Sequence, residues 1–306
     1  MKILIIGSGS IATKHINAIQ SIDKNSSFYA LRHDTKSIDQ RHLYSIYKWH
    51  DVPEDIDFIM ISNPTHLHSK TIIRAIKLNK PLFIEKPPVS TLNEWKEVHK
   101  ALEPTNIQTY CGFVLRFHPL IEWLKRHINT KDVLEFHAYC GSYLPDWRKN
   151  MNYTQSYSAN KEQGGGVHLD LIHEIDYLLW LFGKPLTSKG FVKKISNLKI
   201  DSFDSAHYYL EYTNTVGTVT LNYFRKDPKR NLLIVLKNGA LTIDLIKNTI
   251  TDHKGNLVFS SKTKSSDLIK KQMNYFLDCL RNKKTNMNQF GDTYDSMKTC
   301  LNITEL

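Results

Sequence analysis

The sequence predicts an α/β domain with a doubly wound parallel sheet, followed by an α+β domain with a large, mainly antiparallel open sheet. Three observations lead to this fold class. The first part of the chain alternates short apolar runs with helical patterns, whereas a later stretch contains strand after strand. A length of 306 residues also suits two domains better than one core. We therefore expect residues 1–118 to form the first domain and residues 119–306 the second.

The expected elements of the first domain alternate between strand and helix. Apolar runs predict strands at residues 2–6, 28–31, 58–62, 82–85 and 107–114. Apolar residues at helical spacing predict helices at residues 11–22, 67–78 and 92–102. Short buried strands separated by helices are typical of βαβ units, and right-handed crossovers then give a doubly wound parallel sheet.

The second domain begins with a long extended run at residues 133–144, and a polar stretch without clear periodicity follows it. A strong helical pattern then covers residues 166–182. Further strands are expected at residues 205–212, 216–224, 231–236 and 241–246, and further helices at 266–281 and 292–303. Many strands and few helices indicate a mainly antiparallel sheet.

Composition limits the class of protein. Hydrophobic residues make up 41% and charged residues 23% of the chain, which is typical of a globular protein and not of a disordered one. No apolar run is long enough to span a bilayer and no export signal is evident, so we expect a cytoplasmic protein without a membrane segment. The four cysteines are widely scattered, so we expect no metal site.

The net charge of +11 points to an anionic partner, either nucleic acid or a phosphorylated or carboxylated small molecule. The lysines are spread along the whole chain, without a dense basic helix or a recognition motif. We therefore expect general surface charge with some bias toward an anionic small-molecule ligand, and no nucleic-acid partner.

The first strand runs directly into a glycine-rich turn of the form G-x-G-x-x-A, and a helix follows. Gly7 would permit the tight turn, Gly9 the approach of a pyrophosphate, and Ala12 close packing of helix on strand. The helix N-terminus would present free N–H groups to the phosphates. This context predicts a Rossmann-type dinucleotide-binding domain, whose cofactor-binding loop comprises Gly7, Ser8, Gly9, Ser10, Ile11 and Ala12.

The residues after the second strand bear on the choice between NAD and NADP. An NAD site typically has an acidic residue there, which binds the ribose hydroxyls. Arg32 and His33 occupy this place, with Lys36 nearby, and an arginine suits a 2′-phosphate. Asp34 could still serve the ribose if the strand ends later. We expect NAD or NADP, with NADP favoured by Arg32.

Two further polar motifs follow predicted strands. Asn63, Pro64 and Thr65 come after the third strand, with His68 a few residues on, and Glu85-Lys86-Pro87 lies at the carboxyl end of the fourth. Ligands of open α/β sheets bind outside the carboxyl ends of the strands. The glycine loop, the Asn63-Pro64-Thr65 turn and the Glu85-Lys86-Pro87 turn are therefore expected at one edge of the sheet.

Together these motifs resemble the Gfo/Idh/MocA oxidoreductase family. The resemblance rests on the glycine loop, the Asn63-Pro64-Thr65 turn, Glu85-Lys86-Pro87, the Arg116-Phe117-His118-Pro119 turn and the glycine-rich stretch 164–177. It implies an NAD(P)-dependent dehydrogenase or reductase that transfers a hydride between the nicotinamide and a secondary alcohol or ketone of a sugar or sugar derivative, including phosphorylated or nucleotide-linked ones. It also implies a second domain for substrate binding and oligomerisation, and a homodimer or homotetramer.

The resemblance implies roles for particular residues. Lys86 would lie near the nicotinamide and the reacting carbon and would shuttle a proton, and Glu85 would orient it. Asn63 and Thr65 would touch the nicotinamide side of the cofactor. Further candidates for cofactor binding are Pro64, His68, Glu85 and Lys86.

The predicted helix at 166–182 places Asp170, His173, Glu174 and Tyr177 within one arc, opposite an apolar face. We expect this polar arc to face the substrate. The resemblance implies that Asp170 and His173 are catalytic and that His173 is the base for a substrate hydroxyl. The aspartate-to-histidine spacing is three residues instead of the family's four, which leaves His168 as a rival.

A loop rich in aromatic residues precedes the glycine run. Trp147 and Tyr153 offer flat faces for a sugar ring, and Arg148 suits a carboxylate or phosphate. Arg116 could also reach the place where this loop would bind the sugar. A surface loop ordered by its own packing is the alternative interpretation of this segment.

Two other functions stay open at this point. A non-catalytic, nucleotide-sensing regulatory protein could keep the cofactor site without turnover, although the presence of Lys86, Asp170 and His173 together argues against it. An imine reductase or an oxidation–elimination catalyst would use the same cofactor, and the sequence does not separate these from a dehydrogenase.

Overall fold

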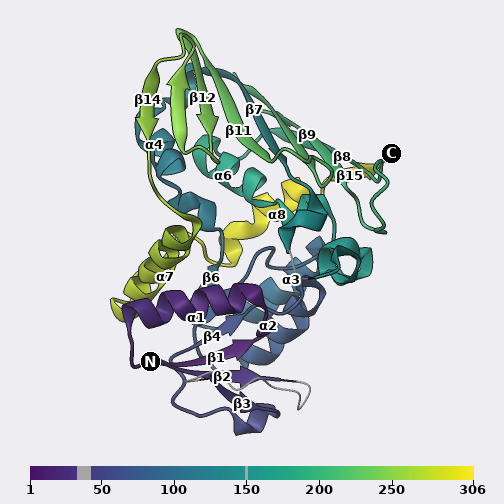
Figure 1. Cartoon of the computed structure of the whole chain (residues 1–306). Coiled ribbons are helices and arrows are strands. Elements are labelled where there is room, and N and C mark those ends of the chain that lie inside the picture. The colour runs from purple at the N-terminus through teal and green to yellow at the C-terminus, as the bar shows by residue number, and fades with distance from the viewer. Residues whose placement is uncertain (33–42, 149–150) are drawn as a thin grey trace. The chain divides into compact units, whose positions relative to one another are not determined.

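The computed structural model describes residues 1–32, 43–148 and 151–306 (Figure 1). The chain divides into two compact units. The first contains Met1–Val114 and Lys264–Tyr294, and the second contains Leu115–Thr263 and Asp295–Leu306. Within the described ranges, no helix is both long and apolar enough to cross a membrane.

The first unit contains a six-stranded sheet in the order β3-β2-β1-β4-β5-β6, and every neighbouring pair of strands is parallel. The strands are β1 (Lys2–Ile6), β2 (Ser27–Leu31), β3 (Leu43–Ile46), β4 (Phe58–Ile61), β5 (Leu82–Ile84) and β6 (Thr109–Cys111). The helices that alternate with them are α1 (Ser10–Ile22), α2 (His68–Ile76) and α3 (Leu92–Leu102). The predicted doubly wound parallel sheet is confirmed, and its strand order reverses between β1 and β4.

Helix α7 (Ser265–Arg281) returns to this first unit and packs on α1. The buried Phe276 ring meets Phe58 and Phe83 edge-on, at centroid distances of 5.1 and 5.3 Å. The sequence predicts that residues 119–306 form the second domain, whereas Lys264–Tyr294 belong to the first unit. The apolar face of α7 instead covers aromatic side chains of β4 and β5.

The second unit contains a nine-stranded sheet in the order β14-β13-β12-β11-β7-β10-β9-β8-β15. Most pairs are antiparallel, and β7–β10 and β8–β15 are parallel, so the predicted mainly antiparallel sheet is confirmed. The strands are β7 (Val133–Gly141), β8 (Thr187–Lys193), β9 (Ser205–Glu211), β10 (Val216–Asn222), β11 (Lys229–Leu236), β12 (Gly239–Asp244), β13 (Thr249–Asp252), β14 (Leu257–Ser260) and β15 (Ile303–Glu305).

Helices α4 (Pro119–His127), α6 (His173–Phe182) and α8 (Tyr294–Leu301) lie on one side of this sheet (Figure 1). Phe182 of α6 stacks on Phe136 of β7 at 4.5 Å, and the Tyr208 hydroxyl of β9 donates to the Cys300 carbonyl of α8. Short 3₁₀ turns account for much of the remaining chain: Trp49–Asp51, Thr65–Leu67, Val114–Phe117, Thr130–Asp132, Leu144–Trp147, Tyr153–Gln155, Tyr157–Ala159, Lys161–Gln163 and Gly291–Thr293.

The predicted single helix at 166–182 is two helices, α5 (Val167–Asp170) and α6. Leu171 leaves the helical conformation, with φ −101° and ψ 22°. At the break the Glu174 N–H bonds to the Leu171 carbonyl at 3.0 Å, a three-residue spacing in place of the helical four. The break changes the direction of the side chains that follow it.

Candidate active site

The turn after β1 needs a glycine at its first position. Gly7 has a φ of +96°, and a Cβ there would lie 2.2 Å from the Asn63 backbone nitrogen. The Ser62 hydroxyl, at the end of β4, donates to the Gly7 carbonyl at 2.7 Å. Gly7 therefore lets the loop pass directly against the neighbouring strand end.

The second glycine of the loop has a different environment. Gly9 is the N-cap of α1, no side chain of the described residues caps this helix, and a Cβ on Gly9 would meet nothing within 4 Å. Ser8 and Ser10 are exposed, whereas Ala12 is buried. The first-turn N–H groups thus face open space, which fits the pyrophosphate of a dinucleotide.

The turn after β4 is tied to the turn after β5 by His68. Its Nδ1 lies 3.0 Å from the Pro87 carbonyl and its Nε2 2.8 Å from the Asn63 carbonyl. Burial lowers the pKa of His68. The ring is fully occupied by these loops, so a cofactor contact through His68 stays a prediction. Thr65 is buried and Pro64 exposed in the same turn.

The Glu85-Lys86-Pro87 turn follows β5, with a cis peptide bond between Lys86 and Pro87. The Glu85 carboxylate accepts the Lys86 backbone N–H at 3.2 Å. Burial acts to raise the pKa of Glu85, but the hydrogen bond and charge of His15 and the charge of Lys86 outweigh it, and the pKa is lowered. Lys86 itself is half-buried.

A depression of about 460 Å³ lies at the carboxyl ends of β2 and β3. Arg32 lines it with Lys48, His50 and Arg74, and the Arg74 guanidinium stacks over the Trp49 ring at 4.8 Å. Cations and an aromatic face suit a phosphorylated nucleoside. His33, predicted to bind the cofactor, lies outside the described residues, as do Asp34 and Lys36.

In the second unit, most side chains of the predicted polar arc are buried, and the orientation of the arc toward the substrate stays a prediction. Glu174 and Tyr177 are fully buried, and Asp170 and Asp176 almost so. The helix break and ion pairs from other elements explain the burial. The Asp176 carboxylate accepts hydrogen bonds from Nε (2.9 Å) and from one Nη (2.7 Å) of Arg116.

The other two carboxylates have their own partners. The Arg230 guanidinium donates to Glu174 Oε1 through Nε at 2.8 Å and Nη2 at 2.5 Å. Asp170 accepts a 2.5 Å hydrogen bond from the Tyr223 hydroxyl and another from Tyr157. These carboxylates are thus satisfied within the fold, and the catalytic role predicted for Asp170 stays a prediction.

The structure also separates the two candidate histidines. His168 is 5% exposed, its ring lies 5.8 Å from Phe203, and burial lowers its pKa to about 4. Gly166, with φ +124°, makes room for it, because a Cβ there would lie 2.8 Å from the imidazole. His173 is half-buried at the first turn of α6. The greater accessibility of His173 favours it as the substrate-facing residue.

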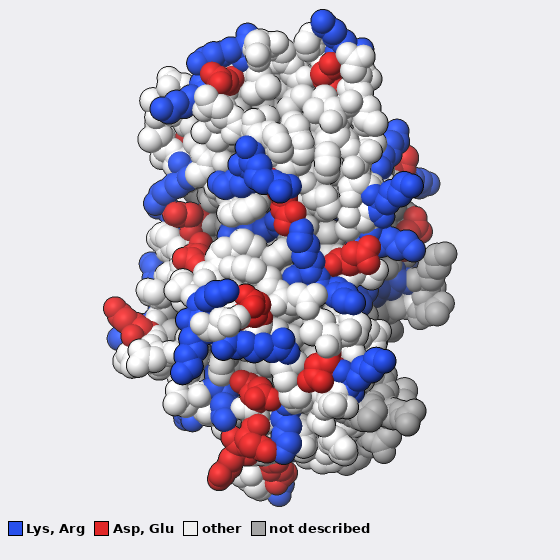
Figure 2. All heavy atoms as spheres, turned by 90° about the vertical axis from the view of Figure 1, so that its left-hand side faces the viewer, with Lys and Arg blue, Asp and Glu red and all other residues white. Residues whose placement is uncertain are grey.

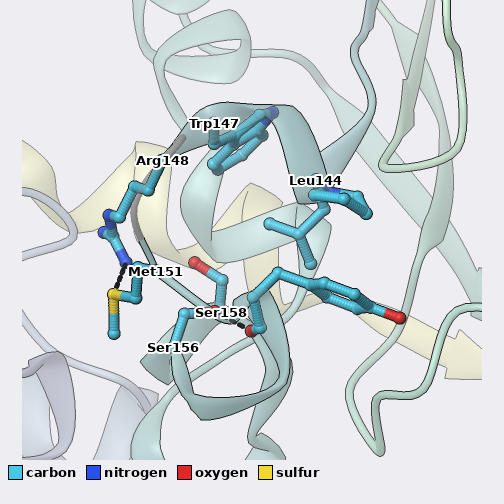
Figure 3. Close-up of a pocket in the computed structure, with 8 residues that line it drawn as sticks. Leu144, Trp147, Arg148, Met151, Ser156 and Ser158 are labelled. Carbon is cyan, nitrogen blue, oxygen red and sulfur yellow. Dashed lines mark hydrogen bonds between the residues drawn. The ribbon is translucent and has the colours of Figure 1, made fainter.

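The aromatic loop encloses a small pocket (Figure 3), which holds about 10 Å³, the space of roughly one water molecule. Trp147 donates its indole N–H to Ser142 Oγ at 2.8 Å, and Arg148 lies over the Tyr157 ring at 5.6 Å. The Lys199 N–H donates to the Tyr153 hydroxyl at 3.2 Å. These contacts fit the packed-loop interpretation, and substrate binding by Trp147, Arg148 and Tyr153 stays a prediction.

Arg116 is likewise occupied by the buried Asp176, so its predicted contact with substrate gains no support from its geometry. Several neighbours of the site were not predicted, namely His15, Lys48, Trp49, Arg74 and Gly112. His15 had one usable signal, since it lies on the buried face of the helix that follows the glycine loop.

Comparison with known families and proteins fits this geometry. A model described as an oxidoreductase family with an NAD-binding Rossmann fold matches residues 1–113, and the GFO/IDH/MocA C-terminal domain model matches residues 130–242. The chain belongs to the Gfo/Idh/MocA family. The predicted resemblance is confirmed, and with it an oxidoreductase whose first domain is an NAD-binding Rossmann fold.

Individual members of the family align over different lengths. The scyllo-inositol 2-dehydrogenase (NAD(+)) of Bacillus subtilis is 26% identical over 265 residues, which is 78% of this chain and 74% of that protein. Levoglucosan dehydrogenase of Pseudarthrobacter phenanthrenivorans is 29% identical over 140 residues, 44% of this chain and 36% of that protein. The structure of UDP-N-acetylglucosamine 3-dehydrogenase GnnA from Acidithiobacillus ferrooxidans superposes with a TM-score of 0.80 at 17% identity, covering 99% and 96% of the two chains.

Proposed function

We propose that this Gfo/Idh/MocA protein is an NAD(P)-dependent dehydrogenase that interconverts a secondary alcohol and a ketone of a sugar or sugar derivative. The open space beside Gly9, at an uncapped helix N-terminus, is the observation that supports it best. A bound nicotinamide would supply the hydride chemistry. The chain's own residues would hold the cofactor, orient the substrate and move the hydroxyl proton.

Side chains of the protein would handle the hydroxyl proton of the substrate. Lys86 would hydrogen-bond the substrate oxygen and handle the coupled proton together with His173, which would take it from or return it to the hydroxyl group. Asp170, buried against Tyr223 and Tyr157, would support the start of α6 and not touch the substrate. Thr65 and Asn63 would border the nicotinamide side of the cofactor.

The substrate class follows from the relatives. Those named above act on an inositol, on levoglucosan and on a nucleotide-linked amino sugar, which all have ring-borne secondary hydroxyl groups. The net charge of +11 favours an anionic member of this class, such as a sugar phosphate or nucleotide sugar. Lys and Arg are interspersed with Asp and Glu on the face in Figure 2. An anionic substrate would therefore be attracted by cations at its binding site and not by this face as a whole.

A substrate screen tests the proposal. Inositols, free sugars, sugar phosphates and nucleotide sugars are each mixed with cofactor, and nicotinamide absorbance is followed. We expect turnover with at least one class and its loss in Lys86→Ala, whereas Lys77→Ala, which removes an exposed lysine after α2, keeps it. Tight cofactor binding without turnover of any class would favour the regulatory alternative.

We further propose that the cofactor is NADP. The support is the cationic depression lined by Arg32, Lys48 and Arg74, whose guanidinium and ammonium groups suit a 2′-phosphate. Affinities for NADPH and NADH, measured by fluorescence titration, test this. Arg32→Ala and Lys48→Ala should each lower the NADPH-to-NADH preference, while Lys24→Ala, at an exposed lysine, should not. An unchanged ratio in both variants would overturn the NADP assignment.

We also propose that the protein is a homodimer or homotetramer that uses the sheet of the second unit. Half-exposed side chains on one sheet face, such as Tyr209 and Leu233, support this surface. Light scattering after size exclusion tests it. Tyr209→Lys should shift the mass toward a monomer, and a monomeric wild-type protein would rule the assembly out.

A further inference from the structure

A buried pair of side chains lies directly behind the turn that contains Lys86. His15, on α1, is 1% exposed, and Glu85, at the end of β5, is 8% exposed. His15 Nε2 lies 2.5 Å from Glu85 Oε1. The pair therefore links the helix of the glycine loop to the turn of the proposed catalytic lysine.

Both oxygens of the Glu85 carboxylate are engaged. While Oε1 meets His15, Oε2 accepts the backbone N–H of Lys86 at 3.2 Å. Gly112, just after β6, leaves room for the carboxylate, because a Cβ there would lie 3.1 Å from Oε1. The carboxylate is thus enclosed by α1, by its own turn and by the end of β6, which fixes its position.

The hydrogen bond has a defined direction. The pKa of Glu85 is lowered, so the group is a carboxylate near neutral pH, and a carboxylate can only accept. His15 Nε2 must therefore donate. Its other nitrogen, Nδ1, is buried without a hydrogen-bond partner among the described residues, so Nε2 carries the ring's side-chain hydrogen bond.

We propose that His15 is a positioning residue for Lys86. It holds the Glu85 carboxylate in place, and the carboxylate holds the backbone from which the Lys86 side chain projects. The inference rests on the proposed function, because only a catalytic Lys86 needs such a fixed position. Since His15 lies on α1, the same pair also joins the lysine turn to the glycine loop.

Removal of the donor should affect rate more than binding. Without His15 the buried carboxylate keeps the Lys86 N–H but loses its stronger partner, and the turn can shift. A displacement of about 1 Å at a reacting group can lower a rate by roughly 100-fold. Substrate contacts made by other residues would be unchanged, so kcat should fall while KM stays close to the wild-type value.

Two variants of His15 separate positioning from simple packing. Glutamine keeps an N–H donor at about the reach of Nε2, whereas phenylalanine keeps the ring without a donor. We expect His15→Phe to lower kcat roughly 10- to 100-fold and His15→Gln to restore most of it. Thr293→Val is the control, since it removes two other buried hydrogen bonds of this unit, the 3.0 Å bond from the Trp95 indole and the 2.7 Å bond to the Phe290 carbonyl, and should leave kcat unchanged.

A second readout does not depend on turnover. Lysines are reductively methylated with ¹³C-formaldehyde, and the Lys86 signal is assigned as the one that Lys86→Arg lacks. We expect this ¹³C signal to move in His15→Phe and to keep its wild-type position in His15→Gln and Thr293→Val.

The outcomes separate the two proposals. Equal losses of kcat in His15→Gln and His15→Phe, or an unmoved Lys86 signal in His15→Phe, would overturn the positioning role. If no substrate is turned over by the wild-type protein, the proposed function fails, and the Lys86 signal alone still decides whether His15 positions the lysine.

Discussion

The strand ends of the first unit and the α5–α6 segment of the second unit differ in whether their polar groups face open space or are buried and paired. At the strand ends, α1 begins without a side-chain cap and the space beside Gly9 is open. In α5–α6, Asp170, Glu174 and Asp176 are each buried against a hydroxyl or guanidinium group. Groups satisfied within the chain stabilise the fold, whereas groups that face open space are available to a ligand.

The largest effect on stability is expected at the Arg116–Asp176 pair. Among the residues that the structure describes, Arg116→Met would leave the buried Asp176 carboxylate with the weaker 3.3 Å side-chain contact of Ser296. Loss of one partner of a buried ion pair typically destabilises a protein by about 3–5 kcal/mol. Urea unfolding of the variant measures this loss.

Two controls accompany that experiment. Arg116→Met combined with Asp176→Leu should recover much of the loss, because no charge is then left buried. Lys237→Met breaks an exposed pair with Asp132 and should change the free energy of unfolding by less than about 1 kcal/mol. An Arg116→Met protein as stable as the wild type would mean that Arg116 is held for another purpose, such as the predicted substrate contact.

The second effect is a loss of stability at mildly acidic pH, which arises in the second unit. Burial lowers the pKa of both His118 and His168 from 6.5 to about 4, with the Arg230 charge also acting on His118. Between these values the unfolded state binds more protons, so stability is present above pH 6.5 and is lost as pH falls toward 4. Each histidine contributes at most about 3 kcal/mol to this loss.

Urea unfolding at neutral pH and at about pH 4.5 measures how steeply the free energy of unfolding falls as the pH is lowered. His168→Gln should flatten this slope, and His50→Gln, at an exposed histidine, should not. Glu85 of the first unit acts in a lower window, because its contribution is lost only as pH falls through its lowered folded pKa, below the ordinary 4.5. A slope that His168→Gln leaves unchanged would argue against a neutral, buried His168.

The comparison also shows which parts the sequence could predict. The strand–turn–helix at the glycine loop and most of the first sheet depend on local patterns and agree with the prediction, although β3 was not predicted. The carboxylates of α5–α6 depend on partners far along the chain, such as Arg230 and Tyr223, so no helical pattern could indicate their burial. The return of α7 to the first unit is equally non-local, since its amphipathic pattern does not identify the surface it covers.

The third effect on stability is expected at Gly7, the first of the two glycines in the loop after β1. Gly7→Ala places a Cβ 2.2 Å from the Asn63 backbone at a φ of +96°. A left-handed conformation alone disfavours a residue with a Cβ by roughly 1–2 kcal/mol, and the contact with rigid backbone adds to this. We expect a loss of about 2 kcal/mol or more in the free energy of unfolding, and an unchanged value would contradict the close packing of this turn.

The smallest effect on stability, and the most informative one for function, is expected at Gly9. Its φ of −76° is available to alanine, and the added Cβ meets no protein atom within 4 Å, so Gly9→Ala should unfold like the wild type. The same methyl group would occupy the space through which a pyrophosphate approaches the N–H groups of α1. Affinity for NADH or NADPH, followed by fluorescence titration, should therefore fall at least about tenfold, or 1.4 kcal/mol. Stability retained with affinity lost would mark this space as the phosphate site, whereas wild-type affinity would show that the cofactor approaches the loop from elsewhere.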